Sequence, residues 1–322
     1  MTTMRDIAAE LDLAVSVVSR ALDGNPERHR MVAEATWRRV LEAAARLDSR
    51  RNPAAATLRW GGNIGIGVWL TESRARLAGM MAKGVGEGAM RENLPLFLSI
   101  GYTEDVFSEF VRVSRNYAQS GLISYAAPFI RFPALAGELE RYCRDGGKMV
   151  LLSCYFDDFR IPGAAVVGID DFFGGELVGV HLRERGVEEL FFVGAESKRY
   201  RGVCRGYGRE LPRLNDVAGA AGVLAGVRTG GRLAGLAAGS DAVAAGLERL
   251  VLERGLVPGR DVLITGYNDS EVAELLPYPL TTVRQDMYAV GLAAVQSLVK
   301  LAGGKTPEDV LIKPELVIRA TA

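Results

Sequence analysis

Paired carboxylates are the residues of this sequence with the most evident capacity for chemistry. Asp157-Asp158 and Asp170-Asp171 each follow a short apolar run of the kind that forms a buried strand. Oxygen ligands of this kind could hold Mg²⁺. An aspartate at a strand end can equally cap the helix that follows. We favour capping, because each pair stands between an apolar run and a predicted helix.

Histidine and cysteine, the other common metal ligands and nucleophiles, are scarce. The two histidines, His29 and His181, lie too far apart in the sequence to indicate a shared site. Cys143, Cys154 and Cys204 are odd in number and lack the spacing of a metal or redox motif. We expect buried reduced thiols and no metal site.

Two glycine-rich stretches could be mistaken for phosphate-binding loops. Residues 84–88 precede an apolar run, whereas a nucleotide-binding loop follows a strand, so they indicate close packing of two helices. Residues 217–231 are rich in glycine and alanine and indicate a shortened connection. With no nucleophile elbow and no dinucleotide fingerprint, the sequence argues against an enzyme and predicts no cofactor.

The elements that must position any site change character along the chain. From residue 64 onward, short continuous apolar runs alternate with helical or glycine-rich stretches, which is typical of parallel strands buried on both faces. Ligands of such sheets bind at the carboxyl ends of the strands. Ten runs are too many for one sheet, so we predict an α/β body of two lobes, each with a doubly wound parallel sheet. The runs are residues 64–70, 94–100, 121–126, 148–153, 165–169, 190–194, 233–238, 261–267, 280–284 and 315–320.

Residues 1–49 indicate a small all-α head. Apolar residues recur at helical spacing in three segments, and only three residues, 12–14, separate the first two segments. So short a turn forces the helices to cross steeply, which predicts a helix-turn-helix. The spaced residues are Ile7, Ala8 and Leu11, then Val18, Ala21 and Leu22, then Val40, Ala44 and Leu47.

A linker joins the head to the body. Asn52 before Pro53 is typical of a helix start, and a glycine pair at 61–62 ends the short helix that follows. A helix this short is marginal in water, so DNA could order it. We therefore divide the chain into a head (1–49), a hinge helix with linker (50–62) and a body (63–322).

Charge and hydropathy add two expectations. The formal net charge of the whole chain is zero, but all ten basic residues of positions 1–62 are arginine, which suits contacts to phosphate and guanine. Residues 1–13 lack the apolar run of a secretory signal, and the apolar runs are too short to cross a bilayer. We expect a cytoplasmic protein.

Four motifs in this order resemble the lac-repressor-type (LacI/GalR) family of bacterial transcriptional regulators. The resemblance spans nearly the whole chain. The motifs are Asp6-Ile7-Ala8 through Val18-Ser19-Arg20 to Gly24; Asn52-Pro53-Ala54-Ala55 with Leu58; Val167-Gly168-Ile169-Asp170-Asp171 with Gly174-Gly175; and Gly266-Tyr267-Asn268-Asp269 followed by residues 279–285.

The resemblance implies how the chain would bind DNA. The second helix would enter the major groove, with Arg20 reading guanine through its bidentate fork. The hinge helices of a homodimer would lie in the minor groove, with Leu58 wedged into a base step. Such a dimer reads a pseudo-palindromic operator in double-stranded DNA. The candidate DNA contacts are Val15, Ser16, Ser19, Arg20, Asn52, Ala55 and Leu58.

The resemblance also implies a body similar to periplasmic sugar-binding proteins, with a small-molecule effector such as a sugar in the cleft. The candidate effector contacts are Ser73, Ser153, Arg199, Ser240, Asn268 and Gln285.

Several positions depart from the family pattern. Ala14 stands where the family usually has a serine cap, and Arg51 replaces the usual hinge proline. Val203 occupies the position of the usual sugar-binding arginine, with Arg199 and Arg201 nearby as substitutes, and Asn268 replaces an aspartate. The set of sugar-binding side chains is therefore thinned.

The function we predict is sequence-specific regulation of transcription, as a repressor of a carbohydrate-use operon under the control of a small molecule. The alternative is a cytoplasmic small-molecule (sugar) binding module whose head no longer reads DNA. An enzyme on a doubly wound sheet is the third and least favoured class.

Overall fold

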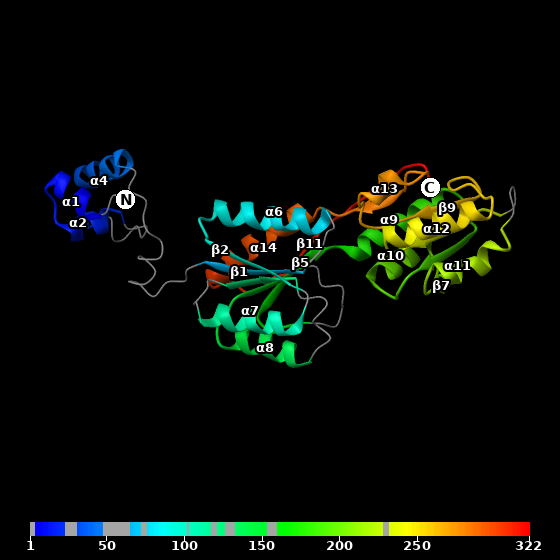
Figure 1. Ribbon diagram of the computed structural model, residues 1–322, viewed down its shortest axis with the longest axis horizontal. Coiled ribbons are helices and arrows are strands. Elements are labelled where there is room, and N and C mark those ends of the chain that lie inside the picture. The colour runs from blue at the N-terminus through cyan, green and yellow to red at the C-terminus, as the bar shows by residue number, and fades with distance from the viewer. Residues whose placement is uncertain are drawn as a thin grey trace. The chain divides into compact units, whose positions relative to one another are not determined.

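The computed structural model divides the chain into two compact units, Met1–Gly62 and Asn63–Ala322 (Figure 1). No helix of the described residues is both long and apolar enough to span a membrane. The structure describes residues 4–22, 31–47, 65–71, 76–101, 103–116, 121–125, 133–152, 160–227 and 232–322.

The first unit packs three described helices around one small core. They are α1 (Met4–Leu11), α2 (Val15–Ala21) and α4 (Glu34–Arg46). Each helix contributes one wholly buried branched side chain, namely Ile7, Val18 and Val40. The helical spacing of the sequence therefore predicted the inward faces of this unit correctly.

The turn between α1 and α2 closes on Asp12, which has a left-handed backbone (φ 54°). The N–H of Leu13 donates to the carbonyl of Ala8 at 2.9 Å, and the N–H of Asp12 donates to the carbonyl of Ala9 at 3.4 Å. These two bonds form a Schellman motif, which satisfies carbonyls at the end of α1 and redirects the chain within three residues.

The second unit begins with a lobe built on a six-stranded parallel sheet in the order β11-β5-β4-β3-β1-β2. Helices α6 and α14 lie over one face and α7 and α8 over the other (Figure 1). The strands are β1 (Ile66–Thr71), β2 (Leu96–Gly101), β3 (Gly121–Ser124), β4 (Met149–Leu152), β5 (Ala164–Ile169) and β11 (Val310–Ile312). The helices are α6 (Arg76–Arg91), α7 (Glu104–Asn116), α8 (Pro133–Arg144) and α14 (Met287–Ala302).

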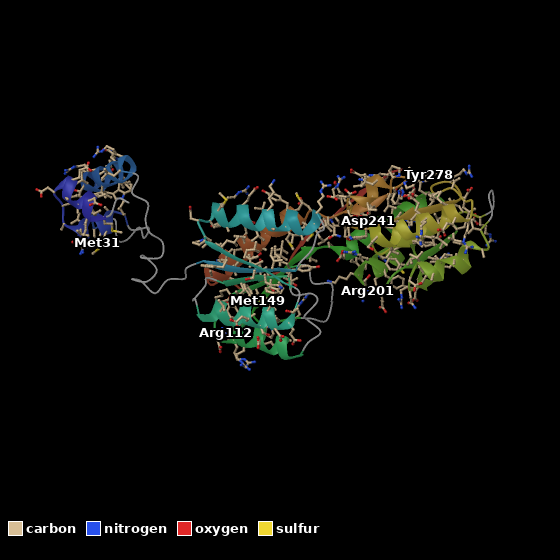
Figure 2. The ribbon with its side chains drawn as sticks, in the orientation of Figure 1. Met31, Arg112, Met149, Arg201, Asp241 and Tyr278 are labelled. Carbon is tan, nitrogen blue, oxygen red and sulfur yellow. The ribbon has the colours of Figure 1, made fainter. Side chains whose placement is uncertain are left out.

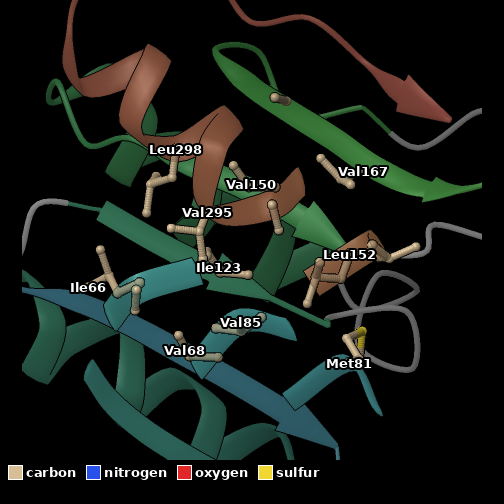
Figure 3. Packing of buried hydrophobic residues seen from close by; sticks show 14 of the residues in the cluster. Ile66, Val68, Met81, Val85, Ile123, Val150, Leu152, Val167, Val295 and Leu298 are labelled. Carbon is tan, nitrogen blue, oxygen red and sulfur yellow. The ribbon is translucent and has the colours of Figure 1, made fainter. Parts of the chain in front are cut away.

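The core of this lobe shows why its strands are continuous apolar runs. Val68 and Val150 of the sheet pack with Val85 of α6 and Val295 of α14 (Figure 3). Trp69, the neighbour of Val68 in β1, packs on the opposite face with Phe107 and Phe110. Successive residues of one strand thus enter two different cores, so neither can be polar.

The other lobe carries a four-stranded parallel sheet in the order β7-β6-β8-β9. Its strands are β6 (Glu189–Val193), β7 (Arg213–Leu214), β8 (Ala234–Ala238) and β9 (Val262–Thr265). Its helices are α9 (Asp171–Glu184), α10 (Lys198–Tyr207), α11 (Val217–Leu224), α12 (Asp241–Glu253) and α13 (Val272–Leu275).

Three chain crossings connect the two lobes. They lie between β5 and α9, between β10 (Thr282–Arg284) and α14, and between β11 and β12 (Glu315–Val317). The crossings are hydrogen-bonded to neighbouring segments, for example from the N–H of Asp170 to the carbonyl of Ile312 at 2.9 Å. These crossings are the segments about which the two lobes would move.

The two-lobed α/β architecture is confirmed, and three of the sequence predictions need correction. The runs at 280–284 and 315–320 contribute β10 and β12, which pair antiparallel instead of joining a parallel sheet. Two short strands, β7 and β11, were not predicted, because two or three residues carry no periodicity. Residues 217–224 form helix α11 instead of a plain connection, and α11 buries Ala220 and Leu224.

The glycines at 84–88 pack two helices together, as predicted. A Cβ on Gly84 would lie 2.2 Å from the carbonyl oxygen of Tyr288, and one on Gly88 would lie 3.1 Å from Val295. Helices α9 and α10 meet in the same way, since a Cβ on Gly175 would lie 2.2 Å from the carbonyl oxygen of Arg199. This contact places the first turn of α10, which carries Arg199, directly against α9.

Candidate functional site

The outer face of α2 is the first candidate site. Val18 and Ala21 face the core of the head, whereas Val15 is 41% exposed. Ser16 and Arg20 are also exposed, and Ser19 is half-buried. The structure thus places the four predicted base-reading residues of this helix together on one short segment, with three of them open to a partner.

Other arginines of the head are occupied by contacts within it. Arg46 of α4 forms an ion pair with Glu10 of α1, and Arg39 donates to the carbonyl of Leu11 at 3.5 Å. Among the described residues, no carboxylate pairs with Arg20. An exposed guanidinium of this kind can make a bidentate contact to a base edge.

The start of α2 lacks a side-chain cap, as the sequence indicated. Ala14 is the N-cap in an extended conformation, and no side chain bonds to the first turn there. The first free N–H groups of α2 therefore have no side-chain acceptor at Ala14, which leaves the helix N-terminus with its partial positive charge. The hinge candidates Asn52, Ala55 and Leu58 lie outside the described residues.

Arg199 is the centre of the second candidate site. It lies in the first turn of α10, is 7% exposed and donates through Nε to Asp171 Oδ1 at 2.9 Å. Its Nη1 donates to the carbonyl of Gly239 at 2.8 Å, and its guanidinium carbon lies 3.8 Å from the centre of the Tyr267 ring. Residues that follow β5 of one sheet and β8 and β9 of the other sheet thus meet around one side chain.

Asn268 connects this arginine to a chain crossing. Its Oδ1 accepts from Gln285 Nε2 at 2.6 Å and from Arg199 Nη1 at 3.4 Å. Asn268 and Asp269 both have positive φ angles, 121° and 51°, which are costly for residues other than glycine. Strained backbone of this kind persists where surrounding contacts hold it, and it is concentrated at binding sites.

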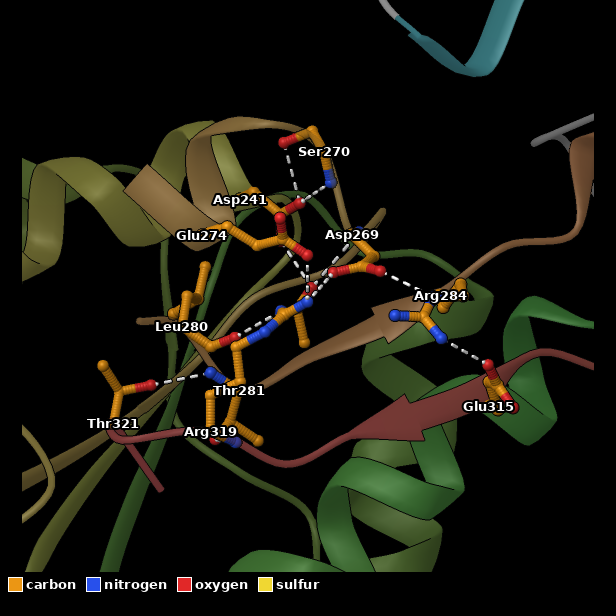
Figure 4. A network of polar contacts seen from close by, with 11 residues as sticks. Asp241, Asp269, Ser270, Glu274, Leu280, Thr281, Arg284, Glu315, Arg319 and Thr321 are labelled. Atoms are coloured by element: carbon orange, nitrogen blue, oxygen red, sulfur yellow. Dashed lines mark hydrogen bonds and ion pairs between the residues drawn. The ribbon is translucent and has the colours of Figure 1, made fainter. Parts of the chain in front are cut away.

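A network of ion pairs holds the strained loop from behind (Figure 4). Asp269 accepts from Arg284 at 2.6 Å and pairs with Arg319 at 2.7 Å, and Arg284 also donates to Glu315 at 2.8 Å. Burial raises the pKa of Asp269, but hydrogen bonds from Arg319 and Arg284 outweigh it and leave the pKa below its ordinary value. Arg284 therefore joins two of the three crossings through salt bridges.

Asp241 supports the same loop from the N-terminus of α12 (Figure 2). It is fully buried and accepts from the hydroxyl of Thr282 and from the backbone N–H of Ser270, the latter at 2.7 Å. Burial raises the pKa of Asp241, and these hydrogen bonds offset the effect in part. Asp241 thus ties the residue after the strained loop, Ser270, and strand β10 to the start of α12.

Three of the six predicted effector residues come together, namely Arg199, Asn268 and Gln285. Ser240 is the N-cap of α12 in the structure, because its hydroxyl accepts from the N–H of Val243. Ser73 and Ser153 lie outside the described residues. Val203 is buried in the lobe core. The arginine of this site is instead Arg199, one helical turn earlier in α10.

The aspartate pair at 170–171 has two roles. Asp170 caps α9 by accepting from the N–H of Phe173 at 3.0 Å, as predicted, while Asp171 pairs with Arg199. The sequence analysis missed Asp171, Tyr267 and Arg284 as members of the site. Only the position of each at a strand end could have indicated a role.

A cavity of about 310 Å³ opens beside Asn268 and Gln285. Residues of α6 and of two crossings line it, so it lies between the lobes of the second unit. Its lining residues are Arg76, Leu77, Met80, Asn268, Asp269, Arg284, Gln285, Asp286, Met287, Lys313 and Glu315.

Known proteins resemble the chain over nearly its whole length. Residues 180–322 match the family model of the periplasmic binding protein-like domain. The transcriptional regulator MalR of Streptomyces coelicolor is 27% identical over 346 residues, covering 99% of this chain and 96% of MalR. Head, linker and body thus align together with a helix-turn-helix regulator. These matches support a regulator of the lac-repressor-type (LacI/GalR) family, as the sequence motifs indicated.

Solved structures share the fold. A lac repressor dimer bound to operator and an anti-inducer aligns with a TM-score of 0.68 at 20% identity, covering 99% of this chain and 98% of that one. The regulator CelR in complex with cellobiose aligns with a TM-score of 0.66 at 18% identity, with both chains fully covered. The LacI/GalR architecture of a helical head and a two-lobed body therefore applies to the whole chain.

Proposed function

We propose that this LacI/GalR-family protein is a sequence-specific DNA-binding regulator, a repressor of a carbohydrate-use operon, whose affinity for DNA depends on a small molecule in the body. The observation that carries the proposal is the exposed face of α2. Val15, Ser16 and Arg20 are presented outward on a helix whose other side is buried in a packed three-helix unit.

The short α2 suits the major groove, which admits one helix and shows a distinct pattern of donors and acceptors for each base pair. Arg20 would read guanine through two parallel hydrogen bonds, while Val15 and Ser16 contact neighbouring base edges. Residues 50–62 would act as the hinge that lies in the minor groove, with Leu58 as the wedge.

A second copy of the chain is the partner that the proposal requires, because a two-fold dimer reads a pseudo-palindrome. Strand β2 offers a surface for it. This strand ends the six-stranded sheet, and Phe97, Leu98 and Ile100 are 44%, 47% and 59% exposed. Unpaired edge strands are usually protected by charge or proline, and β2 contains neither.

The cavity between the lobes would couple ligand to DNA. A ligand there touches the crossings that carry Gln285 and Lys313, so it favours one hinge geometry over another. Only a difference in affinity between two geometries can shift their populations. The sign of the effect, release or tightening, follows from which geometry suits the operator.

Catalysis is not part of the proposal. The curated relatives with matching length are named as transcriptional regulators, and each strand-end carboxylate described above is tied to a cap, an arginine or a hydroxyl. A binding module with an inactive head is the second candidate, and the uncapped start of α2 at Ala14 is the observation that favours it.

Selection of random duplex DNA by the purified full-length protein at physiological salt tests the proposal. We expect enrichment of an inverted repeat with a flexible central step. Binding that is weak, salt-sensitive and without sequence preference would favour the binding module and leave the body as the only active part.

A further inference from the structure

The cavity at Asn268 and Gln285 differs from a typical site for a neutral sugar because its carboxylates already accept hydrogen bonds from groups of the protein. Neutral sugars are rich in hydroxyl donors, so carboxylate acceptors bind them well. Asp269 is committed to Arg284 and Arg319, and Glu315 is committed to Arg284. Asp286 accepts from the N–H of Ala289 at 2.8 Å and so caps α14.

The two cationic side chains of the same cavity, Arg76 and Lys313, have fewer partners within the protein than the carboxylates do. No described carboxylate lies within ion-pair distance of Arg76 or Lys313, and both side chains are exposed. The ammonium of Lys313 lies 5.0 Å from the centre of the Phe173 ring, an interaction that positions the charge without using its N–H donors for a carboxylate. The amide nitrogen of Gln285 already donates to Asn268.

The apolar lining of the cavity also argues against a neutral sugar as the ligand. Its described apolar lining consists of Leu77, Met80 and Met287, with no aromatic ring to stack on the face of a sugar. These flexible side chains adapt to shape but select weakly. Charge therefore has the larger part in selecting a ligand.

We infer that this cavity binds a small polar molecule that carries an anionic group, phosphoryl or carboxylate, and that Arg76 and Lys313 bind that group. Charge-assisted hydrogen bonds to such groups are about twice as strong as neutral ones. The inference rests on the proposed function, of which it names the effector class.

The positions of the two cations would make such a ligand an effector. Arg76 lies at the start of the described part of α6 in the first lobe, and Lys313 lies in the crossing between β11 and β12. An anion held by both connects a helix of one lobe to a segment that leads into the other. Its binding free energy would therefore depend on the angle between the lobes.

Thermal unfolding and titration calorimetry of the full-length protein test the inference with defined probes: inorganic phosphate, glucose 6-phosphate and gluconate against glucose and ribose. We expect a rise in Tm with the anionic sugars that weakens with added salt. Glucose 6-phosphate and gluconate distinguish a phosphoryl from a carboxylate preference, and inorganic phosphate shows how much the anion contributes alone.

Variants locate the site. Arg76→Gln and Lys313→Gln should each weaken binding of the preferred anionic probe by about tenfold or more, whereas Lys305→Gln, an exposed lysine outside the cavity, should leave it unchanged. The inference is overturned if glucose or ribose binds as tightly as glucose 6-phosphate and gluconate, if neither anionic sugar binds, or if both cavity variants bind like wild type. DNA selection is performed both without a probe and with each probe, which covers release and tightening alike, so failure of the regulator proposal would show separately.

Discussion

The guanidinium of Arg199 lies over the ring of Tyr267, with its central carbon 3.8 Å from the ring centre. The same guanidinium bonds to Asp171, which follows strand β5, whereas Tyr267 follows strand β9. One side chain thus links a chain crossing to the strained loop that carries Asn268. Loss of this link should affect both the stability of the second unit and the shape of its cleft.

Replacement of Arg199 by glutamine should lower the free energy of unfolding by about 3 kcal/mol, because Asp171 is left as a nearly buried charge without its partner. Urea denaturation followed by circular dichroism measures the change. Arg205→Gln is the matched control, since Arg205 is exposed on the same helix, and it should change stability by less than about 0.5 kcal/mol. Adding Asp171→Asn to Arg199→Gln should recover part of the loss, and no recovery would contradict the ion pair as its cause.

Replacement of Arg20 by alanine should relax the preference at one base pair in each half-site of the selected operator, by about 1–3 kcal/mol. Competition binding with operators mutated at single positions measures this preference. Arg38→Ala removes an exposed arginine of α4 that pairs with Glu34, and it should leave the preference intact. An Arg20→Ala protein with unchanged base preference would remove Arg20 from the reading face.

Replacement of Asp12 by glycine should stabilise the head by roughly 0.5–1 kcal/mol, because residue 12 has a left-handed backbone that glycine adopts without strain. Asp12→Ala should destabilise it instead. Thermal unfolding of the full chain, monitored by the fluorescence of Trp37 with Trp60 and Trp69 replaced by phenylalanine, reports on the head. Equal effects of the two variants would contradict a conformational origin.

Asp269 should make the free energy of unfolding of the second unit depend on pH in the acidic range. Its pKa is lowered in the folded state, so its contribution is present above the unfolded pKa and is lost as the pH falls through the folded pKa. Between about pH 5 and pH 2 the wild type should lose more stability than Asp269→Asn. At pH 7 the variant should be less stable by about 2 kcal/mol, because Arg319 and Arg284 lose a charged acceptor. Parallel urea titrations at several pH values measure both effects, and parallel curves would contradict the assignment.

The double replacement Leu98→Lys and Ile100→Lys should shift the protein toward monomer, since like charges would face each other across two β2 edges. Light scattering coupled to size-exclusion chromatography measures the mass. Leu311→Lys is the control, because Leu311 is 49% exposed on β11 at the opposite edge of the same sheet. A dimer that survives the β2 replacements but dissociates with Leu311→Lys would place the interface at the other edge.

Local spacing was sufficient to predict much of this protein. Periodicity alone separated the inward Val18 and Ala21 of α2 from the outward Val15, Ser16 and Arg20, because a helix repeats every 3.6 residues wherever it is placed. Continuous apolar runs predicted the parallel strands, since both faces of such a strand are buried. The cap at Asp170 and the missing cap at Ala14 also depend only on neighbours in the sequence.

The tertiary structure decided which residues share the cleft. Arg199, instead of residue 203, reaches the strand ends because close glycine contacts hold the first turn of α10 against α9, and sequence spacing carries no such information. The pairing of Asp269 with Arg284 and Arg319 joins residues 15 and 50 positions apart. Whether a carboxylate is free to bind a ligand depends on these long-range contacts, so only the folded chain determines what the cleft can accept.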